Sequence, residues 1–374
     1  MSNGRVDRSS VKRINEETAS RLKAHRLSEG DLVLARRGDI GRLASIAAGE
    51  EGWVCGTGSM RIHAPNHDVL DPGFLRYAMS APSVGEWLVG QAVGATMPNL
   101  NAEIVLAVPL RVPAIKTQRR VAAACSAFDR LIAINERRIE LLEDLARSLY
   151  RDRFVHFRVE KHGEMKLVDS ALGPIPADWD VKGLYEVANI GFGFPFKSSG
   201  FTDSGRNPVV RIRDVPVGMT NTFTDEEPDL RYRVADGDIL IGMDGNFHVR
   251  QWSGGEAWLN QRVARLRPRG ELGAKHLMLA VVDPIRHLNS SIVGTTVAHL
   301  GKRHLEEIRL VMPPARLLAT VGGRLDALGD LQLSCEKQIR SLSVVRDLLL
   351  PRLVTGELDI SDIDLGVLTP AESD

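Results

Sequence analysis

The clearest pattern along the chain is a long run of apolar residues with helical spacing. Between Thr117 and Arg153 there is no glycine or proline. Apolar residues recur there at intervals of three, four or seven: Cys125, Phe128, Ile132, Ile139, Leu142, Ala146 and Leu149. Asn135 interrupts this pattern. About four heptads with this spacing predict a long helix with a coiled-coil seam.

The same pattern returns 200 residues later. The segment 94–154 matches 294–354 without a gap, so that Leu100 aligns with Leu300 and Leu131 with Leu331. The second apolar stripe is Leu325, Leu328, Cys335, Ile339, Leu342 and Leu349, with interruptions at Gln332 and Arg346. A repeat of this length indicates a duplicated domain, which predicts a pseudo-twofold relation within one chain.

The repeat extends upstream of the helices. GDLVLARRG (residues 30–38) matches GDILIGMDG (residues 237–245) at an offset of 207, and Trp53 matches Trp258 at 205. Both nine-residue segments are typical of short strands, and so is the alternating segment PVVRIRDV (residues 208–215). Short helices are predicted at Pro72–Met79, Val84–Val89 and Ala274–Val282.

These patterns predict an α+β chain in which two α/β globules are joined by two long helices. The matched register favours pairing of the helices with each other, antiparallel under twofold symmetry. About 35 residues at ~1.5 Å each would then hold the globules ~50 Å apart, about one and a half turns of DNA. The alternative is that each helix packs on its own globule. The predicted division is 1–112, 113–156, 157–312, 313–360 and an acidic tail at 361–374.

The two copies differ at their beginnings. In the second copy Gly237 lies 58 positions after Trp179, whereas the first copy has only 29 residues before Gly30. We therefore expect the first globule to lack its opening elements, either because the true start lies upstream or because the chain is a truncated form.

Composition narrows the possible classes of protein. The 374 residues are 43% hydrophobic and 26% charged, which is typical of two or three folded domains. Apolar runs are far shorter than the ~20 residues of a membrane helix, and no signal peptide is recognisable. Three cysteines cannot build a disulfide framework, so we expect a cytoplasmic protein.

Total charge does not indicate nucleic acid, because 48 basic residues balance 48 acidic ones. Basic residues do cluster locally, at 5–42, 197–213 and 262–275. Guanidinium groups suit phosphates and the guanine edge, although an ordinary solvated surface is the alternative. Two polar loops could approach DNA: GFGFPFKSSGF (residues 191–201), whose phenylalanines could instead be core, and GATMPNLN (residues 94–101).

No catalytic or metal-binding motif withstands inspection. GTTVAHLGK (residues 294–302) has the wrong spacing for a phosphate loop. The closest match to the adenine methyltransferase pattern [D/N]-P-P-[Y/F/W] is Met312–Ala315, which lacks both ends. The histidine pairs His63/His67 and His299/His304 are better explained as surface residues than as metal ligands. We therefore expect a protein without catalytic residues, metal or cofactor.

The residues resemble the specificity (S) subunits of Type I restriction–modification enzymes over about 16–360. RDLLLPRLVTGELDI (residues 346–360) is similar to the end of that family's second conserved helix, and LARSLYRDRFVHF (residues 145–157) to the end of the first. GPIPADW (residues 173–179) resembles the entry to a target recognition domain. Further weak signatures are GFGFPFKS, GDILIGMDG and GATMPNLN, and their order is repeated.

The resemblance implies two target recognition domains that each read half of a split sequence in double-stranded DNA. It implies two long helices that dock two methyltransferase (M) subunits, which hold S-adenosylmethionine. Motor–nuclease (R) subunits would use ATP. The chain itself would supply specificity and no catalysis. The short first domain departs from the family pattern.

The DNA-contacting residues that we predict are, in the second domain, Lys197, Ser198, Arg211, Arg213, Asn246 and Arg250, and, in the first, Arg36, Arg37, Arg42, Thr96 and Asn99. Three alternatives remain open. One is an enzyme, such as a nuclease with an unrecognised site. Another is a coiled-coil scaffold that has lost DNA binding. The third is a half-reader that pairs with another specificity subunit.

Overall fold

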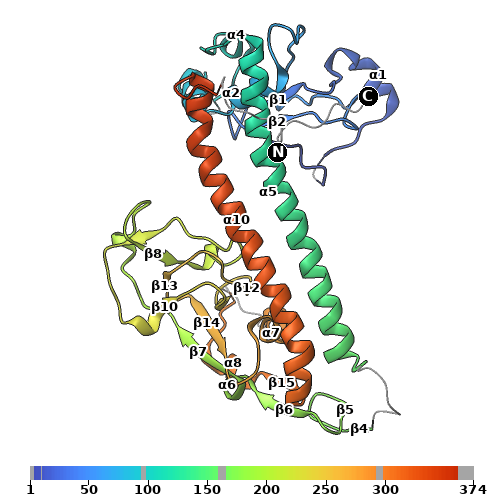
Figure 1. The fold of residues 1–374 in the computed structure, drawn as a ribbon, viewed down its shortest axis with the longest axis vertical. Coiled ribbons are helices and arrows are strands. Elements are labelled where there is room, and N and C mark those ends of the chain that lie inside the picture. The colour runs from blue at the N-terminus through green and yellow to red at the C-terminus, as the bar shows by residue number, and fades with distance from the viewer. Residues whose placement is uncertain (1–3, 10, 94–97, 159–165, 292–297, 361–374) are drawn as a thin grey trace. The chain divides into compact units, whose positions relative to one another are not determined.

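The computed structural model describes residues 4–9, 11–93, 98–158, 166–291 and 298–360 (Figure 1). The chain divides into two compact units. Unit 1 is Met1–Ala133 with Ser341–Asp374, and unit 2 is Ile134–Arg340. Thr96 and the acidic tail fall outside the described residues. The five-part division expected from the sequence stays a prediction.

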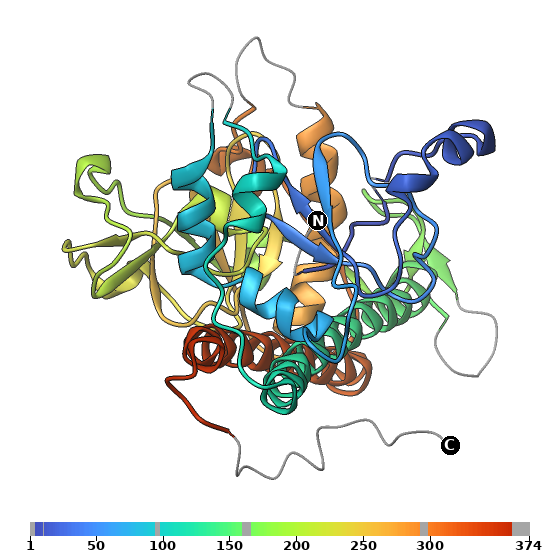
Figure 2. The same ribbon diagram turned by 90° about the horizontal axis from the view of Figure 1, so that it is seen from above.

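Unit 1 contains a three-stranded sheet in the order β2-β1-β3. Its elements besides the long helices are α1 (Glu16–Arg21), a 3-10 turn (Lys23–His25), β1 (Leu32–Ala35), β2 (Leu43–Ser45), β3 (Ser59–Ile62), α2 (Pro72–Met79), α3 (Pro82–Gln91) and α4 (Ala102–Leu106). Leu75 and Met79 of α2 pack under the sheet, and Phe74 and Tyr77 face the long helices. The helix α2 thus lies between the sheet and the helix pair (Figure 2).

Unit 2 contains more strands, including a four-stranded sheet in the order β12-β11-β14-β7 and a second one in the order β10-β13-β8-β9. Its strands are β4 (Leu167–Val168), β5 (Ile175–Pro176), β6 (Asp180–Gly183), β7 (Ala188–Phe192), β8 (Asn207–Val210), β9 (Phe223–Thr224), β10 (Arg233–Val234), β11 (Ile239–Gly242), β12 (Val249–Gln251), β13 (Ala257–Leu259), β14 (Val263–Pro268) and β15 (Arg309–Met312). Its helices besides the long pair are α6 (Leu184–Val187), α7 (Ala274–Ser291), α8 (Lys302–Glu307) and α9 (Ala315–Leu317).

The predicted strand over residues 208–215 is partly wrong. The strand β8 ends at Val210, and Ile212–Asp214 forms a 3-10 turn. The Asp214 carboxylate accepts a hydrogen bond from the Arg211 backbone N–H at 2.8 Å. Such a local side-chain bond competes with a strand ladder, which explains why the alternating pattern does not continue as a strand.

The internal repeat holds at the level of strand register. Leu32 pairs with Ile62 across β1 and β3, and Ile239 pairs with Leu266 across β11 and β14, with all four residue pairs in step. Gly30 and Gly237 both have positive φ, +82° and +91°, which glycine adopts without steric cost. The next residue, Asp31 or Asp238, folds its carboxylate back onto the turn in both copies. The GD motif is therefore a turn that both copies of the duplicated fold share, rather than a site for chemistry.

The unequal beginnings of the copies are visible in the sheets. In unit 2, β7 pairs along β14, and β6 pairs with β15. Neither β7 nor β6 has a counterpart among the described residues of unit 1, where β3 forms an edge of the three-stranded sheet.

The long helices are α5 (Ile115–Tyr150), continued by a π-helical turn (Arg151–Val155), and α10 (Gly323–Thr355), preceded by another (Leu318–Gly322) (Figure 1). In unit 1, Val121 and Cys125 of α5 share a core with Leu350 and Leu353 of α10. In unit 2, Ala146 of α5 shares a core with Leu325 of α10. The beginning of each helix thus meets the end of the other, so the antiparallel pairing is confirmed.

The helices also pack on the globules, so the alternative holds alongside the pairing. Phe74 of α2 belongs to the same core as Val121 and Leu350 in unit 1. Phe154 and Trp179 belong to the core around Leu325 in unit 2. The chain is therefore α+β, with two α/β domains, two long antiparallel helices and an internal repeat.

The polar interruption at Arg346 marks where the globule of unit 1 is attached. Arg346 Nη1 lies 2.9 Å from Asp129 Oδ1 on α5, and Arg76 Nη2 on α2 lies 2.6 Å from Asp129 Oδ2. The Tyr77 hydroxyl donates to the same Oδ2 at 2.8 Å. One partly buried carboxylate therefore joins both long helices to the first globule.

Gln332 does the same in unit 2. Its Oε1 accepts a hydrogen bond from Lys275 Nζ on α7 at 2.6 Å, and its Nε2 donates to Glu143 Oε1 on α5 at 3.1 Å. Gln332 is 7% exposed and Lys275 is 2% exposed. Burial penalises the charged form and lowers the pKa of Lys275.

Candidate nucleic-acid interface

In unit 2, two of the predicted DNA-contacting segments come together on an aromatic base. The guanidinium carbon of Arg211 lies 5.1 Å from the ring centre of Phe201, within the range of a cation–π contact. Lys197 and Ser198 precede Phe201 on the same exposed loop. Arg213 is 64% exposed and donates to Thr222 Oγ1 at 3.1 Å. The surface formed by Lys197, Ser198, Arg211 and Arg213 is called the basic face below.

The phenylalanines of residues 191–201 pack against one another, as expected if they are core residues rather than part of a free loop. The ring centres of Phe194 and Phe196 are 5.0 Å apart, and Phe196 is 5% exposed. A Cβ at Gly193 would lie 2.0 Å from the Asn260 carbonyl oxygen, so only glycine fits there. The aromatic cluster therefore supports the basic face from beneath rather than offering free rings to a ligand.

In unit 1, Arg36 and Asn99 meet although they are 63 residues apart. Arg36 Nε donates to Asn99 Oδ1 at 3.0 Å. The backbone supports the contact, because Leu100 N–H donates to the Arg36 carbonyl and Arg36 N–H donates to the Gly58 carbonyl. These residues, Arg36, Gly58 and Asn99, form what we call the polar corner of unit 1. Arg37 and Arg42 are exposed nearby in sequence, and Arg42 forms an ion pair with Asp39 at 3.2 Å.

Unit 2 has an equivalent corner that sequence analysis missed. Asp244 Oδ1 lies 2.6 Å from His299 Nδ1, and Asp244 Oδ2 accepts from Arg262 Nη1 at 2.5 Å. Burial raises the pKa of Asp244, but the hydrogen bonds from His299 and Arg262 outweigh it, so the net pKa is lowered. Asp244, Arg262 and His299 are called the polar corner of unit 2. The repeat offset of 207 aligns Asp244 with Arg37, so the alignment of the two copies could have identified this position from the sequence.

Asn246 and Arg250 do not join the basic face. Asn246 is exposed in the turn after β11. Arg250 Nη2 lies 2.9 Å from Glu336 Oε1 on α10, and its Nη1 donates to the Pro216 carbonyl at 2.8 Å. The structure therefore uses the Arg250 guanidinium inside unit 2, and its contact with DNA stays a prediction.

The basic cluster at 262–275 is not a basic surface. Arg265 is 9% exposed and donates to the Arg233 carbonyl, while Lys275 is buried against Gln332. Arg267 forms an ion pair with Asp238 at 2.5 Å. These cations therefore form no continuous surface: Arg265 and Lys275 point into the interior, whereas Arg262 and Arg269 are exposed.

The comparisons with known proteins agree with this geometry. Residues 2–144 and 176–341 match the family described as Type I restriction modification DNA specificity domain. Two separate matches, one in each copy, cover most of the chain. The chain belongs to this specificity-domain family.

Individual relatives are similar over part or most of the chain. The Type I restriction enzyme MjaIX specificity subunit of Methanocaldococcus jannaschii is 24% identical over 369 residues, 94% of this chain and 82% of that protein. The EcoBI specificity subunit of Escherichia coli is 33% identical over 184 residues, 48% of this chain and 39% of that protein. The crystal structure of an S subunit from M. genitalium has a TM-score of 0.56 at 19% identity, covering 89% of this chain and 84% of that chain. This structural similarity, at 19% identity, shows a shared fold alone.

Two of the histidines weighed as metal ligands, His63 and His299, each contact an aspartate. His63 Nδ1 lies 2.7 Å from Asp31 Oδ1. In the second copy, Arg267 contacts the equivalent aspartate, Asp238. Within the described ranges, no three His, Cys, Asp or Glu side chains are grouped to hold a metal ion. No helix of the described part is both long and apolar enough to cross a membrane.

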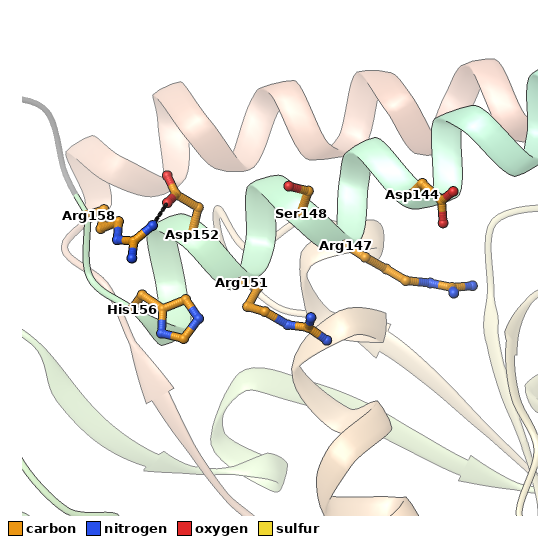
Figure 3. A pocket seen from close by; sticks show the side chains of 7 residues that line it. All are labelled: Asp144, Arg147, Ser148, Arg151, Asp152, His156 and Arg158. Atoms are coloured by element: carbon orange, nitrogen blue, oxygen red, sulfur yellow. Dashed lines mark hydrogen bonds and ion pairs between the residues drawn. The ribbon is translucent and has the colours of Figure 1, made fainter.

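A hollow of about 550 Å³ lies beside the end of α5 in unit 2 (Figure 3). It is lined by Asp144, Arg147, Ser148, Arg151, Asp152, His156 and Arg158. Its cations are largely compensated, since Arg158 pairs with Asp152 at 3.4 Å and Arg147 with Glu143 at 2.6 Å. This balance does not favour a strong anion site.

Proposed function

We propose that this chain is the sequence-specific DNA-binding subunit of a Type I restriction–modification complex and that it recognises a split target in double-stranded DNA. The observation that carries the proposal is the duplication: both copies share strand register and turn geometry, yet they carry different side chains at equivalent corners. Two related readers with different side chains suit a target with two different halves.

The DNA contacts that we propose come from polar and charged side chains of each unit. In unit 2 they are the basic face and Asn246. In unit 1 they are Arg36, Arg37, Arg42 and Asn99, together with Thr96. Lysine and arginine contacts to phosphate would supply affinity that falls with salt, while contacts to base edges would supply sequence preference. Methyl transfer and cleavage would come from M and R subunits, which would bring S-adenosylmethionine and ATP.

Docking of two M subunits is supported by exposed apolar residues on the long helices. Leu131 of α5 and Val345 of α10 lie in unit 1 and are 46% and 42% exposed. Their repeat equivalents, Leu331 and Leu145, lie in unit 2 and are both 55% exposed. Because each unit carries the same kind of apolar pair, we propose that each binds one copy of the same partner.

Removing charge from the basic face should weaken DNA binding without changing the recognised sequence. We expect Lys197→Ala and Arg213→Ala each to weaken binding about 5-fold at moderate salt, and each to reduce the slope of log K against log salt by about one. Fluorescence anisotropy of the full chain with its M partner on target and scrambled duplexes measures both quantities. The exposed Arg316→Ala in α9 is the control and should leave the slope unchanged. Unchanged slopes for Lys197→Ala and Arg213→Ala would remove them from the interface.

Placing a carboxylate in the apolar pairs should reduce the number of bound M subunits. We expect Leu145→Asp to weaken docking at unit 2 by at least ~2 kcal/mol, about 30-fold, so that the assembly retains one M subunit instead of two. Leu145→Asp combined with Val345→Asp should retain none. Mass photometry of the purified complex measures the stoichiometry. Leu172→Asp, in an exposed loop of unit 2, is the matched control, and equal losses in it would contradict the proposal.

A further inference from the structure

The two polar corners occupy the same place in the duplicated fold. In unit 1, Arg36 N–H donates to the Gly58 carbonyl and Leu100 N–H donates to the Arg36 carbonyl. In unit 2, Met243 N–H donates to the Arg262 carbonyl at 3.0 Å, and Leu300 N–H donates to the Met243 carbonyl at 2.7 Å. The same three backbone segments therefore meet in both units. One follows the central strand (β1 or β11), one precedes the neighbouring antiparallel strand (β3 or β14), and one precedes a short helix (α4 or α8).

The side chains at these equivalent places differ. Unit 1 carries Arg36 and Asn99 with a glycine at position 58. Unit 2 carries Arg262 where unit 1 has Gly58, and His299 where unit 1 has Asn99. The backbone is the same in both units, but the hydrogen-bonding side chains on it are different. A purely structural role would not require that difference.

We propose that Arg262 and His299 read a base edge in the DNA half bound by unit 2 and that Asp244 is the residue that positions them. The inference rests on the proposed function and adds specificity-determining residues to it. In this proposal Arg262 donates two hydrogen bonds to a guanine, one to N7 and one to O6, because the spacing of these acceptors matches the two arms of the guanidinium group.

Exposure separates the three residues into two roles. The Asp244 side chain is only 15% exposed and both of its oxygens are engaged. The Arg262 and His299 side chains are 62% and 60% exposed. Asp244 therefore stays within the protein and holds two donors that extend into solvent, since only one of the five guanidinium N–H donors of Arg262 bonds to it.

The charge balance favours a base edge over a phosphate. The negative charge of Asp244 offsets that of Arg262, so the long-range attraction of the corner for a phosphate is small. A bidentate contact with guanine instead depends on a guanidinium plane held in a fixed direction, which the carboxylate provides. The corner keeps its hydrogen-bonding capacity while losing most of its net charge.

The test is the base preference of the full chain with its M partner, measured by selection from a pool of randomised duplexes. We expect Arg262→Ala and Arg262→Lys to relax preference at one position of one half-site and to weaken binding to the best target about 10-fold or more. The lysine variant matters because it keeps the charge but loses the fork. Asp244→Asn should relax the same position. The matched control is Arg286→Ala, an exposed arginine of unit 2 that is also ion-paired, to Asp283 at 2.5 Å.

The outcomes separate the corner from the wider function. Relaxation at one position, with the salt slope unchanged, supports the proposal. A uniform loss on all sequences with the slope reduced by about one would make Arg262 a phosphate contact and overturn it. Full base preference in both Arg262 variants would also overturn it. If the unaltered complex shows no sequence preference, the proposed function itself fails.

Discussion

Asp129→Ala should destabilise unit 1 by about 3 kcal/mol, because it leaves two partly buried arginines without their shared carboxylate. Arg76 and Arg346 are 19% and 25% exposed, and both bond to Asp129, which is 14% exposed. The Tyr77 hydroxyl also loses its acceptor. Denaturant unfolding of the full chain, followed by hydrogen exchange of α2, measures the loss and locates it in unit 1.

The control for this variant is Asp144→Ala on the same helix. Asp144 is exposed, so its replacement should change stability by less than ~0.5 kcal/mol. A second variant, Arg346→Met, should cost less than Asp129→Ala because the carboxylate keeps Arg76 as a partner. Similar small effects from Asp129→Ala and Asp144→Ala would show that the cluster does not attach the globule to the helices.

Acidification from pH 7 to pH 5 should destabilise unit 2 by about 2 kcal/mol through His276 alone. His276 is 1% exposed and packs against Tyr150 and Phe154, with ring-centre distances of 5.4 and 4.3 Å. Burial lowers the pKa of His276 from 6.5 to about 4. The folded state therefore holds a neutral imidazole, and its stability is complete above the unfolded pKa and is lost as the pH falls from about 6.5 towards 4.

His276→Phe isolates this contribution. Aligning the start of α7 with α2 at an offset of 202 places His276 opposite the buried Phe74 of the first copy. Thermal unfolding of both proteins at pH 7 and pH 5 gives the difference, from which other titrating groups largely cancel. The variant should lose about 2 kcal/mol less than the original protein on acidification. Equal losses in the two proteins would show that the pKa of His276 is the same in the folded and unfolded states, which would contradict the prediction.

The sequence predicted the parts of the fold that depend on local spacing. Apolar residues at helical intervals predicted α5 and α10 to within a few residues, and the gapless offset of 200 predicted their antiparallel pairing. The turn glycines and strands of the GD motifs followed in the same way. Periodicity is sufficient for these elements because a helix or a turn is determined by neighbours within about one turn of chain.

Side-chain partners across the fold could not be predicted in this way. Arg250 and Lys275 read as surface cations in sequence, but strand and helix packing carries them to Glu336 and Gln332 on α10. Gln332 and Arg346 read as defects of an apolar stripe, yet they are the points at which the globules are attached.

By itself, the sequence determined that this protein is a duplicated α+β chain with two paired helices and that it resembles a DNA-specificity subunit. Only the tertiary structure decided which polar side chains are buried as partners and which are exposed as donors. Asp244, Arg262 and His299 meet because strand register and loop closure bring together residues 18 to 55 positions apart, and no local pattern encodes such distances.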